Sequence, residues 1–295
     1  MPDRMAKAML NRRLSLGTSA IRLPPGGLLA APLVLYLIVF YAYPVLLMLQ
    51  RSVYEKGWTL DVFMKLLRDG VFWRVMQITG TISLIVTLAC LLLAYPVALF
   101  LARCRQSTAN LLIILVLIPF WTSILVRTYA WMVLLGRRGI INNFLVATGL
   151  IDQPMRLLNT RFAVCVAMVH VLLPFMVLPI YSTLKSLDWR LIRAAEGLGA
   201  RPLAAFRQVL LPLSLPGISA GCILVFTLAI GFYITPALVG GPSDLMISIL
   251  IANQVNILDW PQAAAMAVVL LAVVLVIFAG FTRVMGIEKI FQGQR

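Results

Sequence analysis

Long apolar runs alternate with short charged segments along this chain of 295 residues. A helix needs ~20 mostly apolar residues to cross the ~30 Å hydrocarbon core of a bilayer. Six windows reach that length almost without charge, so the pattern predicts an all-α membrane protein with six transmembrane helices. The predicted spans lie at about 26–50, 75–102, 106–130, 162–184, 217–235 and 260–282.

The fifth apolar window, residues 208–243, is too long for one straight helix. Proline and glycine punctuate helices, because proline lacks an N–H group and glycine adopts turn conformations. Pro212 and Pro216 are therefore expected to break the chain before the span begins at residue 217, and Pro236 is expected to mark its exit.

Positive charge predicts the orientation of the spans. Lysine and arginine concentrate in short cytoplasmic loops of membrane proteins. Five of them precede the first window, and segments on the same side as the N-terminus hold fifteen of the 25 in the chain. Both termini are therefore expected inside (N-in/C-in), with residues 1–25 as a cytoplasmic segment and 286–295 as a cytoplasmic tail. The first window is too long for a signal peptide and is interpreted as a membrane anchor.

Composition agrees with the membrane class, since 62% of the residues are hydrophobic and only 12% are charged. A soluble domain carries about a quarter charged residues. The net charge of +15 does not indicate nucleic-acid binding, because the charges are scattered singly between apolar runs.

Several kinds of chemistry are not indicated. The chain has no Gly-rich phosphate-binding motif, and its four cysteines lack the spacing of a metal or disulfide framework. The lone histidine, His170, is better interpreted as a helix-packing hydrogen-bond partner than as a proton relay, because no span contains an acid to pair with it. We therefore expect no catalytic residue, metal or cofactor, and the missing acids also argue against a proton-coupled transporter.

The segment between the fourth and fifth windows, residues 186–216, carries the most specific pattern. Leu187, Leu191 and Leu198 recur with two alanines at three- and four-residue spacing, which predicts a short amphipathic helix. Gly199 lies where a glycine ends a helix. Such a helix either packs into a partner's groove or lies on the lipid surface.

This segment resembles the EAA loop of type I (MetI-like) permeases of binding-protein-dependent ABC importers. The family pattern is Glu-Ala-Ala, three residues, Gly-Ala, then Leu-Pro and a further proline. Arg193 stands where the family has its first glutamate, and Glu196 follows one helical turn later. The residues at the family's spacing are Ala194, Ala195, Gly199, Ala200, Leu211, Pro212 and Pro216.

Three further stretches, 119–131, 139–143 and 231–242, are similar to permeases of the spermidine/putrescine type. In total the resemblance covers about residues 27–285. It implies a type I ABC importer permease fold, and it makes Phe232, Tyr233 and Thr235 candidates for lining the translocation path. Arg127 is expected to extend toward the outer surface or to form a structural pair.

The resemblance also implies a function and partners. In that family two homologous permease subunits form the pathway, two ABC ATPase subunits hydrolyse ATP beneath it, and an extracytoplasmic binding protein delivers the solute. The chain would then be a multi-pass protein of the bacterial inner membrane, in contact with lipid and not itself an enzyme. Its expected substrate is a polyamine, the alternatives being another small organic solute or a secondary transporter acting alone. The coupling residues implied are Arg193, Ala194, Ala195, Glu196, Gly199, Ala200 and Pro212.

Overall fold

A computed structural model describes residues 27–54 and 60–285, and the regular elements in these ranges are helices. The chain divides into two compact units, residues 1–50 and 51–295, which are considered separately. Among the described residues, five helices are long and apolar enough to cross a membrane, and a bent helix pair supplies a sixth span if it counts as one. The prediction of an all-α membrane protein is therefore confirmed.

The first unit holds one candidate span, Ala31–Gln50. The span lies within a continuous helical stretch made of α2 (Gly27–Leu37), a π-helical turn η1 (Ile38–Ala42) and α3 (Tyr43–Arg51). Tyr43 closes the wide turn by donating its N–H to the carbonyl of Ile38. Pro44 follows directly. A proline ring clashes with the carbonyl four residues earlier in a regular α-helix, and the wider turn gives that ring space.

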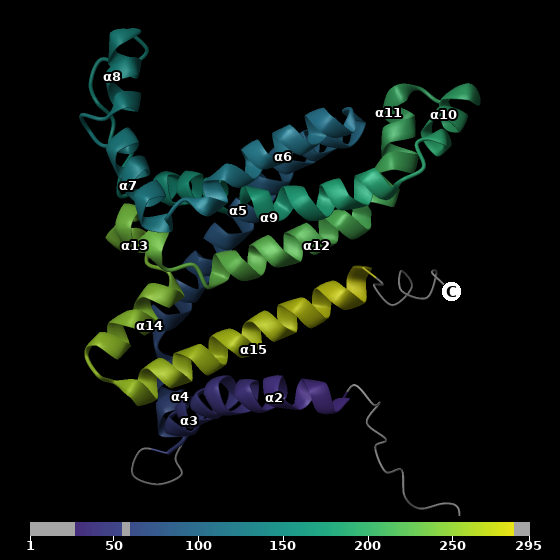
Figure 1. The fold of residues 1–295 in the computed structure, drawn as a ribbon. Coiled ribbons are helices and arrows are strands. Elements are labelled where there is room, and N and C mark those ends of the chain that lie inside the picture. The colour runs from purple at the N-terminus through teal and green to yellow at the C-terminus, as the bar shows by residue number, and fades with distance from the viewer. Residues whose placement is uncertain (1–26, 55–59, 286–295) are drawn as a thin grey trace, which may run out of the picture. The chain divides into compact units, whose positions relative to one another are not determined.

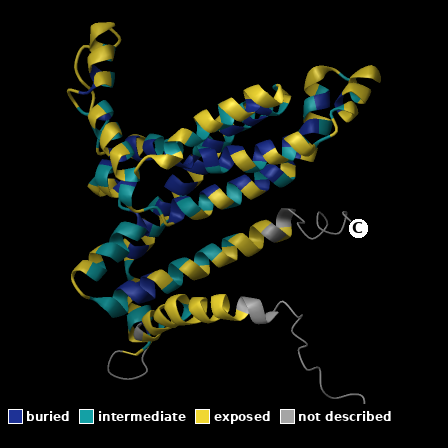
Figure 2. Ribbon diagram, in the orientation of Figure 1, coloured by how far each residue is buried: buried dark blue, intermediate teal, exposed yellow. Residues whose placement is uncertain are grey.

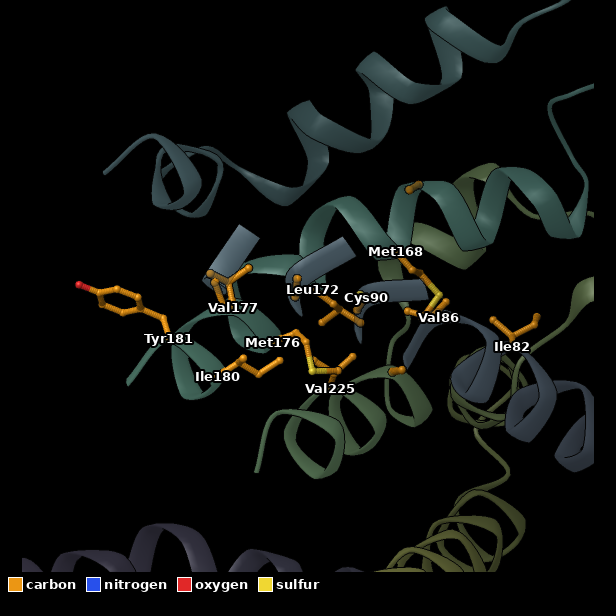
Figure 3. Close-up of a cluster of buried hydrophobic side chains, with 14 of the residues drawn as sticks. Ile82, Val86, Cys90, Met168, Leu172, Met176, Val177, Ile180, Tyr181 and Val225 are labelled. Atoms are coloured by element: carbon orange, nitrogen blue, oxygen red, sulfur yellow. The ribbon is translucent and has the colours of Figure 1, made fainter. Parts of the chain in front are cut away.

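Three long helices form the core of the second unit: α5 (Gly70–Arg103), α9 (Arg161–Ser186) and α12 (Leu211–Ile230). Their buried side chains make one continuous hydrophobic cluster, in which Met176 of α9 lies close to Val225 of α12 (Figure 3). Side chains also fix where the first two helices begin. Asp69 accepts a hydrogen bond from the N–H of Val71, and Thr160 accepts one from the N–H of Ala163.

Two glycines bring α9 and α12 close together. A Cβ added to Gly217 would stand 2.8 Å from the carbonyl oxygen of Pro179, and one added to Gly221 would stand 2.7 Å from the sulfur of Met176. The two glycines are four residues apart, so they lie on the same face of α12. This small-xxx-small spacing permits close helix contact in membranes.

The third span is bent. A continuous helix to residue 130 was predicted, but helix α6 (Gln106–Trp121) ends earlier. The helical segment that follows, Ile124–Ala147, is bent away from it by 91°. The hydroxyl and the N–H of Thr122 both donate to the carbonyl of Pro119, which closes the helix locally. The chain continues through α7 (Ile124–Leu135) and α8 (Ile140–Ala147).

The fifth span differs from the prediction at both ends. One continuous span runs over Pro202–Ile230, through α11 (Pro202–Ala205), the π turn η2 (Phe206–Leu210) and α12. The expected break at Pro212 and Pro216 is wrong, because η2 widens the helix directly before Pro212, as η1 does before Pro44. The helix ends at Ile230 rather than at residue 235.

The second unit contains several further helices. They are α4 (Asp61–Arg68), α10 (Arg190–Gly197), α13 (Ile234–Val239), the 3-10 turn η3 (Pro242–Asp244), α14 (Ile247–Asn256) and α15 (Trp260–Met285). A second buried cluster joins α4, α5, α14 and α15 through Leu66, Phe72, Val75, Ile247, Ala265 and Met266. Within this unit, α10 and α11 lie at one end of α9 and α12, whereas α7, α8 and α13 lie at the other (Figure 1).

Candidate coupling segment

Helix α10 projects beyond the ends of the long helices and is joined to α9 by a short turn (Figure 1). Asp188 begins it by accepting a hydrogen bond of 2.9 Å from the N–H of Arg190. The amphipathic helix predicted from the sequence is thus present, over Arg190–Gly197.

Gly199 ends the helix in the left-handed conformation, with a φ of +89°. Its N–H donates to the carbonyl of Glu196 at 2.9 Å, and the N–H of Ala200 donates to the carbonyl of Ala195 at 3.0 Å. These two bonds define a Schellman motif, which reverses the chain at a helix end and strongly favours glycine. Ala195, Glu196, Gly199 and Ala200 of the sequence pattern therefore form one turn.

The side chains of α10 differ in their surroundings. Ile192 belongs to the main hydrophobic cluster, and Ala195 and Trp189 pack against it. In contrast, Leu191 is 51% exposed and Leu198, directly after the helix, is 90% exposed. Figure 2 shows this end of the second unit as largely exposed. The polar residues Arg193 and Glu196 and the small residue Ala194 are also exposed.

Side chains at the ends of the long helices contact the beginning of the candidate coupling segment, residues 186–216. The guanidinium of Arg103, the last residue of α5, lies 5.2 Å from the ring centroid of Trp189, which directly precedes α10. This is the distance of a cation–π contact. Lys185 of α9 donates a hydrogen bond of 2.5 Å to the carboxamide of Gln106, the first residue of α6. Three spans are therefore tied together where the coupling segment begins.

A second connection lies at the π turn. The ring of Tyr95 on α5 packs edge-on against Phe206 of η2 with centroids 5.9 Å apart. The hydroxyls of Tyr95 and Ser214 are 3.1 Å apart, and the buried Ser214 also donates to the carbonyl of Leu211. Pro212 is exposed nearby on the same span. Helix α5 thus contacts the coupling segment both before α10 and after it.

These positioning residues were missed in the sequence. Trp189 and Arg103 each carried a signal, since a tryptophan precedes the alanine pattern and an arginine ends a span. Their pairing depends on tertiary structure, which sequence spacing does not contain. The seven predicted coupling residues fall into two groups: six surround the Schellman turn, and Pro212 follows the π turn.

The three predicted path residues lie at the break between α12 and α13. Thr235 is buried, and its hydroxyl lies 3.2 Å from that of Thr128, so its side chain faces the interior of the unit. The carbonyl of Phe232 accepts a hydrogen bond of 2.6 Å from Ser248. Tyr233 is 44% exposed. The break therefore presents Tyr233 outward, whereas Thr235 packs against α7.

Polar side chains link neighbouring elements at this end of the unit. Trp131 donates its indole N–H to Nδ1 of His170 at 3.2 Å, the packing bond that the sequence suggested. Arg161 donates to the buried carboxylate of Asp244 at 3.1 Å. Arg127 is half-buried, and its Nε has no hydrogen-bond partner among the described residues. No group of three or more His, Cys, Asp or Glu side chains that could bind a metal occurs in the described ranges.

Comparison with known proteins decides the family. The family model of binding-protein-dependent transport system inner membrane components matches residues 14–286. The chain belongs to this family. It is therefore a permease subunit, and it spans the bacterial inner membrane several times.

Individual relatives agree with this assignment. The spermidine/putrescine transport system permease protein PotB of Escherichia coli strain K12 is 43% identical, over 72% of this chain and 77% of that protein. The inner membrane ABC transporter permease protein YdcU of the same strain is 32% identical, over 88% of each chain. A bacterial alginate ABC transporter, solved in complex with an alginate pentasaccharide-bound periplasmic protein, has a chain of the same fold. The two chains align with a TM-score of 0.72 and 19% sequence identity, over 88% of this chain and 93% of the transporter chain.

Proposed function

We propose that this permease subunit forms half of the solute pathway of an ATP-driven importer and receives the motion of the ATPase subunits through α10. The observation that carries the proposal is the exposed apolar face of α10, above all Leu198. A short helix is marginal by itself in water, and an exposed leucine beside it gains free energy when a partner covers it. The contacts of Trp189 and Phe206 with α5 connect that face to the spans.

The proposed assembly contains two ABC ATPase subunits, a second homologous permease and an extracytoplasmic binding protein. ATP hydrolysis belongs to the ATPase subunits, and this chain supplies no catalytic residue. The description of the family as a binding-protein-dependent transport system supports the binding protein. Leu84, Leu88 and Leu92 are exposed along α5, and they are available to lipid or to the second permease.

The proposed solute is a polyamine, on the basis of the PotB relatives. A different small organic solute is the alternative, since the residues at the α12–α13 break do not select a cation by charge. The long helices α5, α6, α9, α12 and α15 contain no Asp or Glu. A proton-coupled transporter usually needs an acid within the membrane, so this composition favours ATP as the energy source.

Leu198→Asp tests the docking of α10. A carboxylate that loses its hydration in an apolar groove costs several kcal/mol without a partner. We expect the variant to reach the membrane normally but to retain less than a tenth of the ATPase subunit on affinity purification. Leu258→Asp is the control, because Leu258 is 70% exposed and lies in the loop between α14 and α15. Equal ATPase retention in both variants would contradict docking through α10.

The proposed orientation, N-in/C-in, has its own test. In a background without Cys90, Cys104, Cys165 and Cys222, a single cysteine is placed at Arg193 or at Asp61. We expect an impermeant maleimide added to spheroplasts to label Asp61→Cys, and to label Arg193→Cys only after lysis. Labelling of Arg193→Cys in intact spheroplasts, with protection of Asp61→Cys, would reverse the orientation.

A further inference from the structure

A basic concavity lies at the beginning of the fifth span. Its volume is about 540 Å³, and its lining residues come from the N-terminal side of α11 and from the π turn η2. They are Arg201, Leu203, Ala204, Arg207 and Gln208. None of the coupling residues named above lines it.

The charges of this concavity are unbalanced. Two guanidinium groups and one carboxamide border it, and no lining residue is acidic. Neither Arg201 nor Arg207 forms an ion pair with another residue in the part of the chain that the structure describes. Guanidinium groups bind phosphate oxygens through paired, charge-assisted hydrogen bonds. The concavity therefore fits an anion with several oxygens, such as a phosphate.

The apolar border of the concavity indicates what the phosphate is attached to. Leu203 lines the concavity and is 68% exposed. Leu213 and Leu215 are exposed further along the same continuous span. The concavity lies at the beginning of the apolar span Pro202–Ile230, so a ligand bound here has charged groups beside it and exposed leucines further along the span. A phospholipid has that order of polar and apolar parts, whereas a free anion does not.

We propose that Arg201 and Arg207 bind the headgroup phosphate of an anionic phospholipid, whose acyl chains lie along the exposed leucines of the fifth span. Basic sites at the membrane surface attract anionic lipid, with each added positive charge strengthening the attraction. The bound lipid would contact η2, the turn that also holds Phe206 against Tyr95. This site lies beyond the proposed transport function and does not depend on the identity of the solute.

A carboxylate of an ATPase subunit is the competing occupant. The lipid is favoured because the concavity lies at the beginning of a span that carries exposed leucines, and because the exposed leucines of α10, Leu191 and Leu198, do not line it. The experiment below separates the two occupants.

The test uses the full-length chain, purified in detergent with the subunits that assemble with it. Native mass spectrometry measures the binding of added phosphatidylglycerol and, separately, of phosphatidylcholine. We expect Arg201→Gln combined with Arg207→Gln to weaken phosphatidylglycerol binding roughly tenfold and to leave phosphatidylcholine binding unchanged. Arg190→Gln is the matched control, since Arg190 is an exposed arginine of α10 that does not line the concavity. It is expected to bind phosphatidylglycerol like the wild type.

A charge-conserving variant distinguishes a specific loss of lipid binding from misfolding. Arg207→Lys is expected to retain most of the phosphatidylglycerol affinity in a complex that elutes like the wild type. Unchanged phosphatidylglycerol binding in the double glutamine variant would overturn the proposal. So would loss of the ATPase subunit with lipid binding intact, which would assign the concavity to the ATPase. Displacement of the lipid by millimolar inorganic phosphate would identify a site for a free anion instead.

Discussion

Replacement of Gly199 by valine is expected to abolish solute uptake while the protein reaches the membrane in normal amounts. A Cβ at this position would meet no atom within 4 Å, so the change does not create a clash. Its cost lies in the backbone, because the φ of +89° is unfavourable for a side chain by roughly 1–2 kcal/mol or more. Relaxation of that strain would open the Schellman turn and move α10 away from its position.

Gly149→Val is the matched control for this experiment. Gly149 ends α8 with a φ of +71°, its Cβ position is equally open, and its N–H and that of Leu150 form the same pair of helix-ending bonds. Uptake into vesicles with equal protein levels should be lost only in Gly199→Val, and its ATPase activity should no longer respond to the loaded binding protein. Wild-type uptake by Gly199→Val would mean that this turn does not couple ATP hydrolysis to transport.

Gly217→Val should prevent stable folding in the membrane rather than uncouple transport. Its Cβ would stand 2.5 Å from the hydroxyl of Thr183 and 2.8 Å from the carbonyl oxygen of Pro179. The backbone carbonyl cannot rotate away, so α9 and α12 would have to separate. Overpacking of this kind costs roughly 3 kcal/mol, and it would disrupt the core formed with α5.

The measurement is the amount of the folded variant in isolated membranes, together with its thermal stability in detergent. Gly280→Val provides the control, since Gly280 is an exposed glycine of α15 with nothing within 4 Å of its Cβ position. We expect strong depletion of Gly217→Val and normal levels of Gly280→Val. Equal levels and stabilities of the two variants would show that the glycine contact does not hold α9 and α12 together.

Hydropathy predicted the spans well because a membrane span requires a long apolar run, which is visible in the local sequence. A run of apolar residues long enough to cross a bilayer has few alternatives to a helix. The exact ends of the helices were harder to predict from the sequence. Thr122 ends α6 by bonding back to Pro119, whereas Pro212 is accommodated within a helix because a π turn precedes it. Proline thus stands near a break in one case and inside a continuous span in the other, and its local sequence does not distinguish them.

In the candidate site, too, local features were predictable from the sequence and tertiary contacts were not. The turn at Gly199 was predictable, because few residues other than glycine adopt its conformation easily. The neighbours of α10 were not, since Trp189 and Arg103 are far apart in the sequence and meet only when α5 and α9 pack. For the same reason, the burial of Thr235 against Thr128 could not be read from its motif, which placed it in the path.

Reconstitution tests the central claim most directly. The chain is incorporated into proteoliposomes with the second permease and the ATPase subunits, and uptake of radiolabelled spermidine is measured with the binding protein outside and ATP inside. The account predicts uptake that requires ATP and the binding protein, and that continues when the proton gradient is collapsed. Uptake that proceeds without ATP and stops when the gradient is collapsed would contradict it.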